Sequence, residues 1–291
     1  MKNTIVIWIM ISCVQLLGMT NYTMATEYYL CPTTAYFEVY SWDDHDFKLS
    51  PKIYFENINS FAWSNYNRYT GDVYFEGRNP NANILKSYIY NFNINNPAIL
   101  KPVREGRYPA LSTDGKNLVY YQHPNQLWLL NLKNEQTKII ADDVLNYRPP
   151  AWISPNRLLY YSKTRQLILL DILTGEKRAT GHEKIDPGAL SPDGKTVLCT
   201  DGNRIFLYSI DTNKIEVIKE SKHLSIGSDF IWLPDGKSFF YSRQTWAKQL
   251  QFLEGHELFL FSLSDKTEKN LTEARIPFWG SVFIGNHFNP R

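Results

Sequence analysis

The sequence predicts an all-β chain built from repeated four-stranded antiparallel sheets, because two blocks of residues recur in a fixed order. The first block is a short apolar strand ending in a tight turn, at residues 61–64, 108–116, 150–157, 187–195 and 230–237. The second block is a strand rich in Leu, Ile, Phe and Tyr, at residues 87–92, 127–132, 167–172, 205–210 and 258–263. Neither block has helical periodicity. Repeats of about forty residues indicate an architecture in which similar units stack on one another.

Each repeat reads as four antiparallel strands. An inner strand ends in a turn in which Pro presets φ and Asp-Gly supplies the bend, as in Pro192-Asp193-Gly194. A second strand, a loop, a third strand, a polar hairpin and a fourth strand follow. A lone sheet of this size cannot bury both faces, whereas several stacked radially can. This favours a β-propeller over a β-sandwich. A sandwich with coincidental turn signals would not repeat the same two sequence blocks five times in the same order.

Five full blades span about residues 59–272, and the chain ends supply material for a sixth. Residues 276–280 resemble an inner strand, while residues 28–31, 36–41 and 47–50 resemble second, third and fourth strands. One sheet shared by both ends would close the ring and remove its open edges. We therefore expect a six-bladed β-propeller of four-stranded blades, with the terminal strands divided either one plus three or two plus two.

The repeated run Ala189-Leu-Ser-Pro-Asp-Gly-Lys195, followed by strands such as 167–172, resembles the repeat of TolB-type propellers. That family includes the propeller of the periplasmic Tol-system protein, the propellers of prolyl-oligopeptidase-type enzymes and the oligogalacturonate lyases. The resemblance implies the fold, because the motif residues serve folding, and it leaves the function open. The α/β domain of the Tol protein has no counterpart here. The hydrolase domain of the peptidases and its Gly-x-Ser-x-Gly motif have none either.

The first residues read as a secretory signal peptide. Lys2 precedes an uncharged run to Met19, and a small residue, Ala25, follows a short polar stretch. We expect a signal peptide over residues 1–25 and a single propeller domain over residues 26–291. A retained anchor is the alternative, although the run is short for a bilayer span. After cleavage Cys31 and Cys199 remain, which permits a disulfide without indicating one.

Charge excludes one class of partner. The 31 basic and 29 acidic residues give a formal charge of +2 and are spread along the chain. A nucleic-acid-binding surface would need a clustered basic face, so no nucleic-acid partner is expected.

Repeat register predicts a ring of polar residues where the inner strands begin. Counting three residues back from each motif alanine or its equivalent gives Asn59, Arg107, Arg148, Asp186, Ser228 and Arg275. Three arginines in such a ring are suited to gripping a carboxylate or an acidic peptide segment. The alternative is that these residues form an ordinary wet channel wall, with each Arg paired to a neighbouring Asp.

Two further features fall on the same face. His123, His182, His223 and His256 are assigned to its loops, and no two of them have metal-ligand spacing. His182 and His256 are expected near the loop tips rather than on strands. The long loop of residues 243–256 carries Trp246 and Phe252, which would either anchor a partner or fold back over the blade edge.

These features lead to two functional hypotheses. The preferred one is a non-enzymatic, secreted or periplasmic propeller that binds a protein partner of the cell envelope through its loop face and channel mouth. It needs no cofactor, metal or catalytic residue, and no membrane span after signal cleavage. The alternative, suggested by the histidines of oligogalacturonate lyases, is a metal-assisted lyase or hydrolase acting on an extracellular polysaccharide or peptide.

Overall fold

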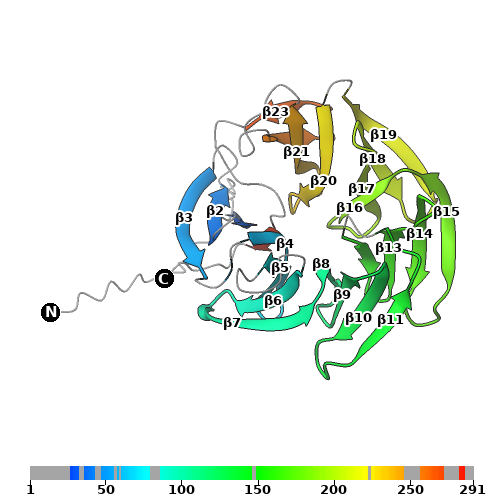
Figure 1. Ribbon diagram of the computed structural model, residues 1–291. Helices are drawn as coiled ribbons and strands as arrows, with labels where there is room; N and C mark the ends of the chain where they lie inside the picture. The colour runs from blue at the N-terminus through cyan, green and yellow to red at the C-terminus, as the bar shows by residue number, and fades with distance from the viewer. Residues whose placement is uncertain are drawn as a thin grey trace, which may run out of the picture.

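The computed structural model describes residues 27–32, 36–42, 47–55, 58, 60–78, 86–145, 149–221, 224–245, 256–271 and 282–285. Within these ranges, twenty-four strands form six four-stranded sheets, every one of them antiparallel (Figure 1). The predicted all-β propeller architecture of four-stranded blades is confirmed. None of the described residues belongs to a helix that is long and apolar enough to cross a membrane. The predicted signal peptide, residues 1–25, lies outside the described residues.

Five blades are each made of four consecutive strands, ordered from the centre outward. Blade 1 contains β4 (Ser60–Asn67), β5 (Asp72–Arg78), β6 (Tyr88–Asn93) and β7 (Asn96–Glu105). Blade 2 contains β8 (Arg107–Leu111), β9 (Asn117–Gln122), β10 (Gln126–Asn131) and β11 (Thr137–Ala141). Blade 3 contains β12 (Ala151–Ser154), β13 (Arg157–Tyr161), β14 (Gln166–Asp171) and β15 (Lys177–Glu183). Blade 4 contains β16 (Asp186–Leu190), β17 (Thr196–Thr200), β18 (Arg204–Ser209) and β19 (Lys214–Glu220). Blade 5 contains β20 (Leu224–Trp232), β21 (Ser238–Thr245), β22 (His256–Ser262) and β23 (Glu268–Asn270).

The remaining four strands form a sheet from both chain ends, which we call the terminal sheet. Its order is β24 (Val282–Gly285), β1 (Glu27–Pro32), β2 (Tyr36–Trp42) and β3 (Phe47–Tyr54). The two ends therefore divide one plus three. The described inner strand is Val282–Gly285, whereas residues 276–280, predicted for that role, lie outside the described residues. Six blades were predicted from repeats; the structure describes five made of consecutive strands, together with this composite sheet.

Inner strands of neighbouring sheets contact one another around the centre. The contacting pairs are β24 with β4, β4 with β8, β8 with β12, β12 with β16 and β16 with β20. Figure 1 shows β2 and β3 of the terminal sheet on the side of the ring between blade 5 and blade 1. The starts of the inner strands consequently gather at one end of the ring, together with the loops that join second to third strands. We call this end the mouth face.

The turns at the opposite end explain the repeated Ser-x-Asp-Gly-Lys motif. Ser191 Oγ donates to Asp193 Oδ1 at 2.6 Å, and the same carboxylate accepts the Lys195 N–H at 3.0 Å. Gly194 then adopts a φ of 72°, which costs a residue without Cβ little. Blade 2 repeats the arrangement with Ser112 and Asp114. The motif residues therefore build the turn, as the sequence predicted.

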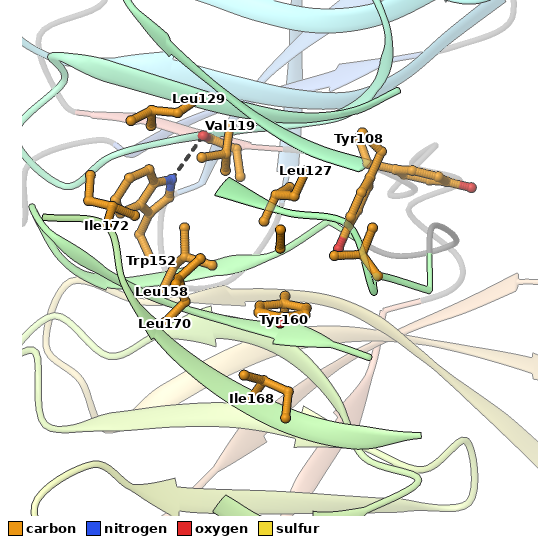
Figure 2. Packing of buried hydrophobic residues seen from close by; sticks show 14 residues of the cluster. Tyr108, Val119, Leu127, Leu129, Trp152, Leu158, Tyr160, Ile168, Leu170 and Ile172 are labelled. Carbon is orange, nitrogen blue, oxygen red and sulfur yellow. Dashed lines mark hydrogen bonds between the residues drawn. The ribbon is translucent and has the colours of Figure 1, made fainter. Parts of the chain in front are cut away.

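Burial between blades follows from strand alternation in the second strand. In β9, Val119 and Tyr121 pack with Trp152, Leu158 and other residues of blade 3. Figure 2 shows Val119 beside Trp152 and Leu158. The alternate residues of the same strand, Leu118 and Tyr120, pack instead on Tyr74 and Ile89 of blade 1. Because successive side chains point to opposite faces, one strand serves two interfaces. Blades consequently depend on their neighbours for a core.

A buried tryptophan ties each of two blade pairs together through a hydrogen bond. Trp152 Nε1 of blade 3 donates to the Ala110 carbonyl of blade 2 at 2.9 Å, drawn dashed in Figure 2. Trp232 Nε1 of blade 5 donates in the same way to the Ala189 carbonyl of blade 4 at 3.1 Å. The recurring Trp of the inner-strand block thus bonds the inner strand of the preceding blade.

Replacing Trp152 with Phe tests this bond. The variant leaves the buried Ala110 carbonyl without its indole donor, so we expect a loss of about 1–3 kcal/mol in the free energy of unfolding, measured by urea titration. Trp128→Phe is the matched control, because Trp128 Nε1 donates only to Gln126 of its own strand, at 3.2 Å. Equal losses in the two variants would contradict the assigned role.

Candidate functional site at the mouth face

Strand register places two of the six predicted ring residues at equivalent positions. Arg107 is the first residue of β8 and pairs with Tyr121, while Asp186 is the first residue of β16 and pairs with Thr200. Ser228 lies within β20, three residues before Ile231, although its side chain is not described. Arg148 and Arg275 lie outside the described residues.

Blade 1 departs from the predicted register. Asn59 lies outside the described residues, and the residue that pairs with Glu76, as Arg107 pairs with Tyr121, is Ala62. Ala62 therefore occupies the ring position of blade 1, three residues after the predicted Asn59. The cause is the turn of residues 67–71, which ends at Gly71 with a φ of 79° and lacks the Pro-Asp-Gly signature used for alignment.

Arg107 is held by a buried carboxylate from the neighbouring blade. Its Nε donates to Oε1 of Glu76 at 3.0 Å, with 43% of the Arg107 side chain exposed and only 5% of the Glu76 side chain. Its Nη2 donates to the Tyr108 hydroxyl at 3.2 Å, and its Cζ lies 4.8 Å from the Tyr108 ring centre. Burial alone would lower the pKa of Arg107, but the Glu76 charge and hydrogen bond raise it. The expected ion pair exists, with a Glu instead of an Asp.

Tyr108 has a backbone conformation that is unusual for a large residue. Its φ is 51°, in the left-handed region, and it directly precedes Pro109, which disfavours helical conformations further. Such conformations cost of order 1–3 kcal/mol and persist only where surrounding contacts hold them. Here the Tyr108 N–H donates to Oε2 of Glu76 at 3.1 Å, and its ring packs edge-to-face on Tyr121. The Glu76 carboxylate thus fixes two residues at the start of β8.

Tyr121 and Asp186 link blade 2 to blade 4 electrostatically. Burial raises the pKa of Tyr121 strongly, and the negative charge of Asp186 raises it further. Asp186 also contributes to the raised pKa of Cys199, for which burial is the larger cause. Cys199 itself is a buried free thiol in β17, so the possible disulfide with Cys31 does not form. Arg107 and Asp186 thus occupy the same register position at the mouth-face ends of blades 2 and 4.

The histidines do not form a cluster in the described part of the chain. His182 lies inside β15, where its Nε2 is 3.0 Å from the Asn213 carbonyl and its ring packs on Tyr208. His256 begins β22, and His123 lies in the turn after β9. The prediction that His182 and His256 lie near loop tips rather than on strands is wrong. Among the described residues, no three His, Cys, Asp or Glu side chains are arranged to hold a metal ion.

Trp246 and Phe252 of the long loop lie outside the described residues, but the strand from which the loop leaves is described. Glu268 accepts the Tyr241 hydroxyl at 2.7 Å and pairs with Lys219 of blade 4 at 3.0 Å. Arg243 lies 3.6 Å from the same carboxylate and 3.8 Å above the Phe259 ring. This cluster joins blades 4 and 5 beside the point where the loop begins.

Glu76 is the site residue that sequence reasoning missed. Its equivalents in blades 2 to 5 are Tyr121, Tyr161, Thr200 and Ser242. A carboxylate where the other repeats carry neutral residues is a signal that a correct alignment of blade 1 would have shown. Glu76 was not identified because the predicted register of blade 1 was wrong by three residues.

The fold defines the chain as a β-propeller of four-stranded antiparallel blades, and the comparisons with known proteins agree. No protein-family model matches the sequence, and no curated protein does either.

Several solved structures resemble the fold. TolB from Acinetobacter baumannii aligns with a TM-score of 0.62 and 15% identity over 86% of this chain and 64% of TolB, so the chain spans less than two thirds of that protein. A chain of the nidogen/laminin complex aligns with a TM-score of 0.62 and 10% identity, over 84% of this chain and 93% of that one. Oligogalacturonate lyase in complex with manganese aligns with a TM-score of 0.53 and 15% identity, over 84% and 72%. At these identities the likeness is one of fold.

Acidification tests the Glu268 cluster. Burial alone would raise the pKa of Glu268, but the Tyr241 and Lys219 hydrogen bonds and the Lys219 and Arg243 charges lower it below its ordinary value. A carboxyl with a depressed folded-state pKa stabilises the fold above its unfolded pKa, about 4.3, and loses that contribution as the pH falls through the folded value.

Glu268→Gln should therefore cost about 1 kcal/mol of unfolding free energy at pH 7. That difference from the parent chain should shrink as the pH falls below about 4. Urea titrations at several pH values measure it. Glu216→Gln is the control, because the exposed Glu216 pairs loosely with Lys266 at 3.7 Å. A pH-independent difference for Glu268→Gln would refute the assignment.

Proposed function

We propose that this chain is a non-enzymatic propeller that binds a protein partner through its mouth face. The observation that carries the proposal is Arg107, an accessible guanidinium held in one orientation by a buried carboxylate and a strained tyrosine. Accessible arginines fixed in this way are favoured anchors for partners, because little conformational entropy is lost when they bind. Asp186, at the equivalent position of blade 4, adds an acceptor to the same face.

The proposal includes closure of the ring by the terminal sheet as a sixth blade. It is supported by the pairing of β24 with β1 and by the contact of β24 with β4. A closed ring fixes the inner strands relative to one another, so residues from several blades can act as one surface. The predicted signal peptide, residues 1–25, supports a secreted or periplasmic location and a partner in the cell envelope.

Glu76 limits the attraction that Arg107 alone would exert on an acidic partner. Because Glu76 neutralises Arg107, attraction of an acidic segment would need Arg148 and Arg275 as well. Trp246 and Phe252 complete the proposed surface, since aromatic side chains dominate interface energetics. They would provide apolar anchors beside the polar centre of the face.

A metal-assisted lyase or hydrolase is the second candidate, and the fold shared with a manganese-containing oligogalacturonate lyase favours it. The described histidines occupy separate places, so this candidate depends on residues outside the described ranges. It predicts bound divalent metal in protein purified without chelator, together with a rise in melting temperature on adding Mn²⁺. A chain free of metal and indifferent to Mn²⁺ would rule it out.

Cross-linking capture from a native envelope fraction, read by mass spectrometry, tests the preferred function. Trp246→Ala and Phe252→Ala should each lower the yield of the captured partner about tenfold while the melting temperature stays within a few degrees. The matched control is Leu173→Ala, which removes an exposed apolar side chain from a hairpin at the opposite end of blade 3. Capture that survives both loop substitutions, or is lost equally with Leu173→Ala, would contradict binding through this face.

A further inference from the structure

One charged residue interrupts the repeat pattern of the second strands. Four described blades place Tyr121, Tyr161, Thr200 or Ser242 at this position, and blade 1 places Glu76 there. Glu76 faces blade 2, where its carboxylate meets the start of β8. A carboxylate that is almost entirely buried is costly unless it is paired and hydrogen-bonded, so its presence at this one position calls for a reason.

The reason lies in the residues that Glu76 contacts. At the position of Tyr108, blades 3 and 4 carry Pro149 and Pro187, which have no N–H group to satisfy. Blade 2 has a tyrosine instead, and Oε2 of Glu76 accepts its buried N–H at 3.1 Å. The other oxygen accepts from Arg107 Nε at 3.0 Å. The two departures from the repeat, Glu76 and Tyr108, therefore form one unit with Arg107 across two blades.

The unit leaves a defined part of the guanidinium available. Glu76 takes the Nε–H, and the Tyr108 hydroxyl accepts one N–H of Nη2. Nη1 takes part in neither bond, and it lies at the end of the fork on a side chain that is 43% exposed. That end is the edge with which arginine binds a carboxylate through two parallel hydrogen bonds.

We propose that Glu76 is a positioning residue, which aims the end of the Arg107 guanidinium at a carboxylate of the protein partner. This inference rests on the proposed function and names the chemical group that the mouth face receives. A negative charge beside Arg107 could also act in the opposite direction, because simple electrostatics would have Glu76 repel an anionic ligand and weaken its binding. The two roles can therefore be separated by the direction in which binding changes.

The experiment uses a fluorescein-labelled octaglutamate peptide, with octaglutamine as the uncharged comparison, and fluorescence anisotropy at low ionic strength. Glu76→Gln should weaken octaglutamate binding about tenfold, although the chain becomes more positive, because an amide holds the guanidinium less firmly than a carboxylate. Arg107→Lys should weaken it similarly at unchanged net charge, because an ammonium group lacks the planar fork. Glu176→Gln, in an exposed hairpin at the opposite end, removes the same charge and should leave binding unchanged.

Each outcome decides the matter. Tighter binding by Glu76→Gln would show that Glu76 acts only by repulsion and would overturn the proposal. If the melting temperature shows that Glu76→Gln does not fold, Arg107→Lys decides alone, and unchanged affinity in that variant overturns the proposal. Failure of the parent chain to bind octaglutamate also overturns it. The proposed partner binding would survive that result, because the capture experiment tests it through Trp246 and Phe252.

Discussion

A four-stranded blade has two apolar faces, and the need to cover both is the constraint on which this structure depends. The second strands show it residue by residue: Val119 and Tyr121 pack on blade 3, while Leu118 and Tyr120 pack on blade 1. Radial stacking meets that need, since each blade covers the exposed face of the next. The Trp152 and Trp232 bonds to preceding inner strands then set how neighbouring blades align at the centre. The mouth face is the product of that alignment.

The repeated elements could be predicted because their signals are local. Asp193 and Gly194 make a turn that depends on nearby residues, so the pattern is legible wherever it recurs. Blade 1 could not be aligned correctly from sequence, because its turn at 67–71 uses other residues. The predicted register was wrong by three residues, giving Asn59 where the structure has Ala62. Pairing between distant strands is decided by packing, which leaves little trace in a single repeat.

The candidate site was only partly accessible to sequence reasoning. Arg107 and Asp186 were found because their positions follow from counting along the repeat. Glu76 was not found, because its role arises from a neighbouring blade and from the N–H group of Tyr108, which Pro149 and Pro187 lack. The Ser-Asp turn and the Trp bond each recur in two described blades, whereas this carboxylate occurs once among the five aligned positions. The proposed site therefore lies where the chain departs from its internal repeat.

Hydrogen exchange measured by mass spectrometry, with and without octaglutamate, locates the binding surface most directly. We expect slower exchange in peptides that cover the start of β8 and the mouth-face end of β5, where Arg107 and Glu76 meet. Turns at the opposite end, such as residues 192–195, should be unaffected. Protection confined to those turns, or protection that persists in Arg107→Lys, would contradict a carboxylate receptor at the mouth face.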